Sequence, residues 1–594
     1  MAMWKLRHFL SENKKEVILG PMFKLLEAIF ELIVPLVIAS MIDDGVRCDN
    51  KNVVIRCGIT LIILAVTGLS STLVCQRFAS IASQNTGTRM RHAFFSHVMT
   101  FSHAEIDRFG TDSLVTRYTA DINQLQLAAA MLIRLVIRAP FLAIGSIIMT
   151  FFIDSRLSLI VLTATPLVLL VLYLVMSKTI PMFSKMRRQL DRTAQIVSEN
   201  LIGIRVIRAF RGQPREKKRF RDKSEEMSAL YRTSGAVSGL LDPLTCIIMN
   251  IAIAVLLGAG AVRVSAGSLS QGEVVALVSY ITQMMLALVV VANLVVTFTK
   301  AEASAARVNE VFETEPSVTD KRASADAVKT LSEFNSKSEV LNFENVTFSY
   351  PSAGEPSVDK ISFSVKAGET VGFIGSTGSG KSTVAALASR FYDISDGSIS
   401  FCGIPIHEIP LSELHACIAI VPQHSMLVSG TVGSNLRYGN SGADDEILIK
   451  ALTAAQALDF VTEKGGLDAP VEQNGRNFSG GQRQRLTVAR ALVSVICGAK
   501  LLILDDVSSA LDTETDRKMR GAIRELTEEY RVAVILISQR ISSMRGTDRV
   551  ILLDDGAVAA SGTHKELARS CELYREIMRS QSEPEPAKEA SENE

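Results

Sequence analysis

The distribution of apolar residues constrains this chain more than any other feature. Up to about residue 312 the sequence holds six long apolar stretches, and after about residue 340 it holds none. Each stretch reaches the ~20 residues that a helix needs to cross ~30 Å of hydrocarbon. Six of them in series are improbable as buried helices of one soluble core. The pattern therefore predicts a multi-pass membrane domain with spans at roughly 17–42, 57–76, 127–153, 157–177, 244–262 and 274–298.

The basic residues predict how these spans are oriented. The connector between the fourth and fifth spans, Lys185 to Arg232, carries fourteen Lys or Arg against six Asp or Glu, and the connector between the second and third spans is also basic. The short connectors are nearly neutral. Because cytoplasmic loops carry the excess of Lys and Arg, we expect both long connectors and both termini in the cytoplasm. Each long connector has the length of two helices that continue ~20 residues beyond the bilayer and turn back.

Composition divides the chain into four parts. We expect a transmembrane domain over 1–312, a polar linker over 313–340, a domain of alternating β-branched runs and helical patterns over 341–580, and a disordered acidic tail over 581–594. The alternation predicts a largely parallel sheet flanked by helices. The net charge of +1 argues against a nucleic-acid partner, and eight cysteines without a CxxC pair exclude a disulfide scaffold or zinc ribbon.

A phosphate loop opens the second domain. It follows the apolar strand Thr370–Ile374, leads into an apolar helix, and comprises Gly375, Ser376, Thr377, Gly378, Ser379, Gly380, Lys381, Ser382 and Thr383. Its glycines let backbone N–H groups converge on anionic oxygens, and the helix N-terminus adds a favourable dipole. We expect Lys381 to reach the β- and γ-phosphates of ATP and Ser382 to coordinate Mg²⁺. A second metal ligand, Asp505, ends the buried run Leu501–Asp505.

A second glycine-containing loop resembles a known family. The stretch Phe478, Ser479, Gly480, Gly481 and Gln482 is similar to the signature loop of ATP-binding cassette (ABC) proteins, whose usual wording begins with Leu. With six preceding spans, the resemblance is to an exporter-type half-transporter and covers nearly the whole chain. It implies an α-helical six-span membrane domain followed by an α/β P-loop nucleotide-binding domain, in which two chains sandwich two ATP-Mg and each signature serves the partner's nucleotide.

Further residues are assigned by the same resemblance. Tyr350 is similar to the aromatic residue that stacks on adenine. Gln423 resembles the glutamine that links the metal to the membrane domain. The remaining match is the loop that crosses the dimer interface, formed by Ser509, Ala510, Leu511 and Asp512.

Three positions depart from the family pattern. Asp506 stands where the family places the Glu that polarises the attacking water, Gln539 stands where it places a His, and Gln473 stands where such exporters commonly carry Glu. Asp506 draws the carboxylate back by one methylene, and a displacement of about 1 Å can cost on the order of 10²-fold in rate. Gln539 can donate a hydrogen bond but cannot become cationic.

This combination resembles the weakly hydrolytic subunit of heterodimeric bacterial multidrug exporters. It implies a second, non-identical half-transporter with intact Glu and His, a small amphipathic substrate, and a bacterial plasma membrane location. Two alternatives stay open. One is a homodimeric exporter of a dedicated lipid or peptide. The other is an ATP-gated regulatory or channel-like subunit with little turnover.

Four charged residues fall inside the predicted spans. Glu27 and Glu31 lie one helical turn apart in the first span, and Arg134 and Arg138 do so in the third. Glu27 and Arg138 lie at a similar expected depth, ~22 Å from the outer ends. Since charges in a span seldom face lipid, we expect either Glu–Arg pairs that lock two helices or snorkelling arginines. The functional alternative is a charged wall of a substrate cavity.

Overall fold

The computed structural model describes residues 2–320, 323–332, 339–351, 353–508 and 511–581. The chain divides into two compact units. The first comprises the residues up to Met99 together with Asp112–Glu313, and the second comprises Thr100–Thr111 together with the residues from Thr314 onward. The expected tail over 581–594 therefore lies outside the described residues except for Gln581.

The first unit is helical throughout. Among the described residues, six helical segments are long and apolar enough to cross a membrane, which confirms the six-span expectation: Lys14–Val46, Lys51–Val98, Thr111–Ile153, Ser158–Ile202, Gln213–Ser265 and Gln271–Glu313. Their large apolar side chains are widely exposed, for example Ile62 and Phe152. This surface suits a hydrocarbon solvent rather than water.

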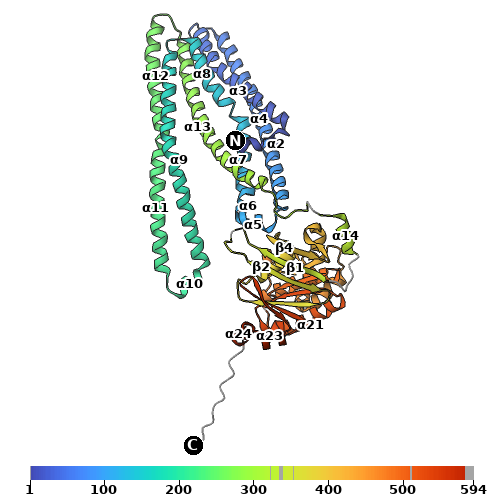
Figure 1. Ribbon diagram of the computed structural model, residues 1–594. Coiled ribbons are helices and arrows are strands. Elements are labelled where there is room, and N and C mark those ends of the chain that lie inside the picture. The colour runs from blue at the N-terminus through green and yellow to red at the C-terminus, as the bar shows by residue number, and fades with distance from the viewer. Residues whose placement is uncertain (1, 321–322, 333–338, 352, 509–510, 582–594) are drawn as a thin grey trace. The chain divides into compact units, whose positions relative to one another are not determined.

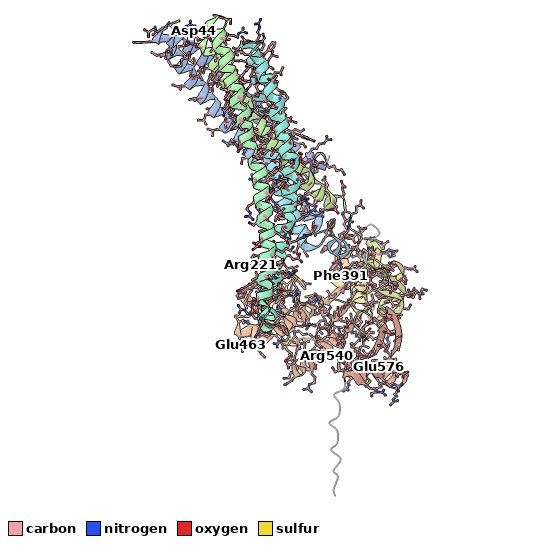
Figure 2. The ribbon with its side chains drawn as sticks, turned by 90° about the vertical axis from the view of Figure 1, so that its left-hand side faces the viewer. Asp44, Arg221, Phe391, Glu463, Arg540 and Glu576 are labelled. Carbon is pink, nitrogen blue, oxygen red and sulfur yellow. The ribbon has the colours of Figure 1, made fainter. Side chains whose placement is uncertain are left out.

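The helices of the first unit extend well past the predicted spans. The elements are α1 (Ala2–Lys5), α2 (Arg7–Ser11), α3 (Lys14–Ser40), η1 (Met41–Val46), α4 (Lys51–Val98), α6 (Thr111–Thr116), η2 (Arg117–Asp121), α7 (Ile122–Arg134), α8 (Arg138–Ile153), α9 (Ser158–Ile202), α10 (Ile204–Ala209), α11 (Gln213–Gly239), α12 (Leu241–Ser265) and α13 (Gln271–Glu313). In Figure 1, α9 and α11 form a long hairpin with α10 at its tip. Figure 2 places Asp44 and Arg221 toward opposite ends of this unit, as the charge pattern of the connectors predicts.

The third predicted span is interrupted, contrary to the continuous stretch expected over 127–153. Helix α7 ends at Arg134 and α8 begins at Arg138. Pro140 lies in the first turn of α8 and has no N–H to donate to the carbonyl of Val136, and its ring crowds that carbonyl. The break therefore places Arg134 and Arg138 at two adjoining helix ends.

The second unit is built on a six-stranded sheet in the order β12-β11-β3-β10-β9-β6, beside a four-stranded antiparallel sheet in the order β2-β1-β4-β5 and the pair β7-β8. The strands are β1 (Glu339–Phe348), β2 (Val358–Lys366), β3 (Thr370–Gly375), β4 (Asp396–Phe401), β5 (Ile404–Pro405), β6 (Ile418–Val421), β7 (Gly430–Thr431), β8 (Pro470–Val471), β9 (Leu501–Asp505), β10 (Ala533–Ile537), β11 (Arg549–Asp554) and β12 (Ala557–Gly562). Strands β11, β3, β10, β9 and β6 are parallel, as the α/β pattern predicts.

Helices surround these sheets. They are α5 (His103–Phe109), α14 (Ala325–Ser332), α15 (Lys381–Ala388), η3 (Ile406–Glu408), α16 (Leu411–Cys417), α17 (Val432–Leu436), α18 (Asp445–Ala454), α19 (Leu458–Glu463), η4 (Gly466–Asp468), η5 (Gln473–Gly475), α20 (Gly480–Ile496), α21 (Thr513–Glu529), α22 (Ile541–Met544), α23 (His564–Ser570) and α24 (Glu572–Gln581). Helix α14 lies within the segment expected to be a linker.

The buried centre of the parallel sheet positions the site. All residues of β9 and β10 are buried, and β10 lies between β9 and β3. Because the carboxyl ends of parallel strands meet at one edge, the residues that follow β3, β9 and β10 are neighbours. These residues are the phosphate loop, Asp506 and the segment that leads to Gln539.

Candidate nucleotide-binding and hydrolysis site

The phosphate loop has the conformation that its glycines permit. Between β3 and α15 the backbone turns through Gly380, whose φ of 93° lies in the left-handed region. A Cβ atom at this position would lie 2.6 Å from the carbonyl oxygen of Ser357. Only glycine therefore fits at the entrance to α15, whose N-terminal amides form the anion-binding end of the loop.

Lys381 lies inside the loop. Its side chain is buried, and its Nζ donates to the carbonyl oxygens of Gly375 (2.9 Å) and Ser376 and to Oγ of Ser379 (3.1 Å). Burial lowers the pKa of Lys381, while the carboxylates of Asp505 and Asp506 act in the opposite direction. The Lys381 ammonium thus donates to neutral oxygens of the loop. When a nucleotide binds, charged phosphate oxygens can take their place as acceptors.

Ser382 and Asp505 meet next to this lysine. The side chain of Ser382 hydrogen-bonds the buried carboxylate of Asp505, whose pKa is raised by burial. A hydroxyl and a carboxylate oxygen are the ligands that Mg²⁺ prefers. These two oxygens therefore fit Mg²⁺. Ser382 and Asp505 would hold the metal, which would stabilise the negative charge of the phosphates. Gln423, the third expected ligand, is exposed beyond the end of β6.

Asp506 is held by its backbone. It has a left-handed φ of 47°, its N–H donates to the carbonyl of Ile537 in β10 (2.9 Å), and its carbonyl accepts a long bond from Nε2 of Gln484 in α20 (3.5 Å). Its negative charge contributes to the raised pKa of Asp505. The carboxylate therefore lies near the metal position on a backbone that neighbouring elements fix from both sides.

Gln539 is exposed, and its backbone is fixed by a contact that sequence reasoning missed. Nε2 of Gln581, the last residue of α24, donates to the Gln539 carbonyl (2.6 Å), and Oε1 of Gln581 accepts from the N–H of Ile541 (2.8 Å). Gln473, the third departure, is exposed in η5. Both substituted side chains are thus on the surface, as contacts with another chain would require.

The signature loop forms a capped helix start. Oγ of Ser479 accepts from the N–H of Gln482 (3.3 Å), and the Gln482 side chain accepts in return from the N–H of Ser479 (3.0 Å). Phe478 is buried against the ring of Phe460 and lies under Nζ of Lys464. The unusual Phe thus belongs to the core of the unit, and the exposed residues Ser479 and Gly480 form the N-terminal end of α20, where backbone N–H groups have no intrahelical partner.

The expected adenine-stacking residue and part of the expected interface loop lie among the described residues. The hydroxyl of Tyr350 lies 3.3 Å from Oγ1 of Thr383 in α15, and its ring stands edge-on to Phe348 and Tyr392. Leu511 is half-buried, and Asp512 caps α21 by accepting from the N–H of Thr515 (2.9 Å). Ser509 and Ala510 lie outside the described residues.

A docking contact within the second unit was also missed. Helix α5 comes from the connector between the second and third spans, yet it packs on the residues that follow α15. The hydroxyl of Tyr392 donates to Oδ2 of Asp107 (2.6 Å), and the His103 ring stacks on Phe391 at 4.3 Å. Burial lowers the pKa of His103, which favours its neutral form against the aromatic ring. The only sequence signal was the aromatic pair at the end of the phosphate-loop helix.

The charged residues of the membrane unit form ion pairs. Nη2 of Arg138 lies 2.7 Å from Oε2 of Glu31, and Nε of Arg138 lies 3.7 Å from Oε1 of Glu27. Glu27 also forms an ion pair with Lys24. This favours the locking interpretation for Glu27, Glu31 and Arg138 and adds Lys24, which the sequence analysis did not include. Arg134 belongs to none of these three ion pairs, and its buried Nε has no hydrogen-bond partner among the described residues.

Comparison with known proteins agrees with this geometry. The family "ABC transporter transmembrane region" matches residues 17–288, and the family "ABC transporter" matches residues 358–509. An uncharacterized ABC transporter ATP-binding protein of Mycobacterium tuberculosis is 33% identical over 98% of this chain and 98% of its own length. An ATP-dependent lipid A-core flippase of Salmonella typhimurium is 29% identical over 91% of each chain. The structure of a bacterial Atm1-family ABC exporter with ATP bound covers 96% of this chain and 99% of its own, with 22% identity and a TM-score of 0.77.

Proposed function

Because this chain belongs to the ABC transporter family and is an ABC-type transport ATPase, we propose that it is one half of a heterodimeric exporter whose own nucleotide site hydrolyses ATP slowly. The chain binds ATP-Mg through Lys381, Ser382 and Asp505. Its capped signature loop completes the competent site of a non-identical partner that carries the usual Glu and His. Asp506 and Gln539 are the catalytic positions that limit its own turnover.

The fixed backbone of Asp506 is the observation that carries this proposal. A shortened carboxylate could regain its reach if the main chain moved forward by about 1 Å. The bonds from Asp506 to Ile537 and Gln484 tie the main chain to β10 and α20, which resist such a shift. Because the Asp506 side chain is one methylene shorter than Glu, its carboxylate polarises the attacking water poorly. This lowers the rate of ATP hydrolysis by a factor on the order of 10².

The basic connectors and the apolar spans support a proposal for the location of the protein and for the compound that it transports. The nucleotide-binding unit and both termini lie in the cytoplasm of a bacterial cell, with the six helices in the plasma membrane. The cargo is a small amphipathic, drug-like compound that enters from the apolar phase. In this account the pairs of Arg138 with Glu27 and Glu31 hold α3 against α8 and do not contact the cargo.

A homodimeric lipid exporter is the second candidate. The similarity to a lipid A-core flippase over 91% of both chains favours it. In that case the chain would provide both halves, and Asp506 would serve as a slower base in two equivalent sites.

One pair of substitutions separates the two candidates. We expect the purified wild-type chain in lipid nanodiscs to have very low ATPase, and Asp506→Glu with Gln539→His to raise it by about 10²-fold wherever two copies associate. Asp506→Asn is the matched control, since it keeps the side-chain length but removes the base. Fast ATPase of the wild-type homodimer, reduced by Asp506→Asn, would support the homodimeric exporter instead.

A further inference from the structure

A cavity on the second unit, separate from the phosphate loop, is lined by arginines. Its volume is about 470 Å³, within the range of small-molecule sites. It lies between α21, β10 and the segment that follows β10. Five arginines line it: Arg517, Arg520, Arg524, Arg540 and Arg545.

The cavity combines this charge with an apolar floor. The floor is made by buried side chains from β9, α21 and β10, namely Leu504, Ile523, Val534 and Leu536. Hydroxyl groups of Ser542 and Thr547 complete the lining. A pocket of this kind matches a ligand that has an apolar body and an anionic head.

The positive charge of the cavity is only partly balanced. Arg520 pairs with Asp516, and Arg524 pairs with Glu528 at 2.7 Å. Among the described residues, Arg517, Arg540 and Arg545 make no ion pair, and Asp516 is the one acid that lines the cavity. Burial lowers the pKa of Arg520, and the nearby charge of Arg540 lowers it further. An unbalanced cluster of guanidinium groups over a low-dielectric floor attracts multiply charged anions.

The cavity also lies close to the hydrolytic positions. Leu504 directly precedes Asp505 in β9, and Arg540 directly follows Gln539. Asp516 accepts from Oγ of Ser508 at 2.7 Å, next to the loop expected to cross the dimer interface. Arg540, labelled in Figure 2, lines the cavity and is exposed. An occupant would therefore touch both strands that carry the site, from the face away from ATP.

We propose that this cavity is a second anion-binding site of the nucleotide-binding unit, which takes a soluble organic phosphate. Arg517, Arg540 and Arg545 bind the phosphate group, and the floor of Leu504, Ile523 and Val534 holds the organic body. The site is distinct from the phosphate loop and does not depend on whether the chain pairs with itself or with another.

Phenyl phosphate and inorganic phosphate are suitable probes. They are titrated calorimetrically into the full chain in zwitterionic nanodiscs, with Lys381→Ala present throughout so that the phosphate loop does not contribute. We expect phenyl phosphate to bind about tenfold more tightly than inorganic phosphate, because the ring removes apolar surface from water. Arg517→Gln with Arg545→Gln should weaken binding at least tenfold, whereas Lys518→Gln, on the same helix but outside the cavity, should leave it unchanged.

Three outcomes would overturn the proposal. The first is the absence of phenyl phosphate binding in the Lys381→Ala chain. The second is equal binding by the chain with and without the two Arg substitutions. The third is binding that emerges only after residues 582–594 are removed, since these carry five Glu against one Lys and would then be the occupant. A further arm uses nanodiscs that contain anionic phospholipid: unchanged affinity supports a soluble ligand, and a tenfold loss would assign the cavity to lipid headgroups.

Discussion

The phosphate loop and the segment after β10 lie at the same edge of one parallel sheet, yet they are equipped differently. After β3, the phosphate loop carries every residue expected to hold phosphate, and Lys381 makes three hydrogen bonds inside the loop. After β9 and β10, Asp506 and Gln539 stand at the positions where the family resemblance leads us to expect Glu and His. In the proposed function, such a site keeps its affinity while it loses its rate, because the phosphate loop is intact and the hydrolytic positions are substituted.

The largest expected effect concerns the phosphate loop. Lys381→Ala should weaken ATP-Mg binding by at least 10²-fold, since it removes a buried cation from the phosphates and leaves the carbonyls of Gly375 and Ser376 without this donor. Equilibrium binding of a fluorescent ATP analogue to the purified chain measures it. Lys366→Ala, at the exposed end of β2, is the control. Similar affinities for both variants would show that binding does not depend on the loop.

The pH dependence of ATP binding should test the role of Lys381 in the phosphate loop. Burial lowers the pKa of Lys381 in the nucleotide-free protein, and bound phosphate oxygens raise it again. Binding therefore takes up a proton at pH values between these two pKa values, and ATP affinity falls with rising pH by up to about tenfold per unit in that window. Below the window this lysine adds no pH dependence.

Lys381→Arg tests that assignment, because a guanidinium stays charged throughout. Binding titrations from neutral to alkaline pH should show a flatter profile for this variant than for the wild type. Identical slopes would place the titrating group elsewhere.

The smallest expected effect concerns the segment after β10. Gln581→Ala removes two hydrogen bonds that hold Gln539 and Ile541, and we expect a loss of about 1 kcal/mol in unfolding free energy, since Gln581 is exposed. ATP affinity should change less than twofold. Thermal unfolding and nucleotide binding are compared with Ser580→Ala, the neighbouring control. A large loss of ATP affinity in Gln581→Ala would show that the two strand ends are not independent.

Local patterns predicted much of this molecule. The six apolar stretches lie in six long helical segments, and the phosphate loop lies between a buried strand and a helix, because both signals depend on neighbouring residues alone. The interruption at 135–137 was missed even though Pro140 signals it, because a hydropathy pattern does not register a lost backbone hydrogen bond.

Contacts between residues far apart in the sequence could not be predicted from local patterns. Gln581 meets Gln539 across 42 positions, and Tyr392 meets Asp107 across 285, through polar side chains that look like ordinary surface residues in the sequence. Arg138 was paired with the glutamates by estimated depth, but Lys24, in the same span as both glutamates, was overlooked. Helix bundling and sheet topology bring these groups together, and neither can be read from residue spacing.

A single-turnover experiment measures how fast this chain hydrolyses ATP without a partner. The wild-type chain alone is loaded with a substoichiometric amount of radiolabelled ATP and Mg²⁺, and the bound nucleotide is identified over time. We expect the label to stay bound as ATP for many minutes in the wild type and to be converted quickly to ADP in Asp506→Glu with Gln539→His. Conversion to ADP within seconds by the wild-type chain, with no second polypeptide present, would contradict it.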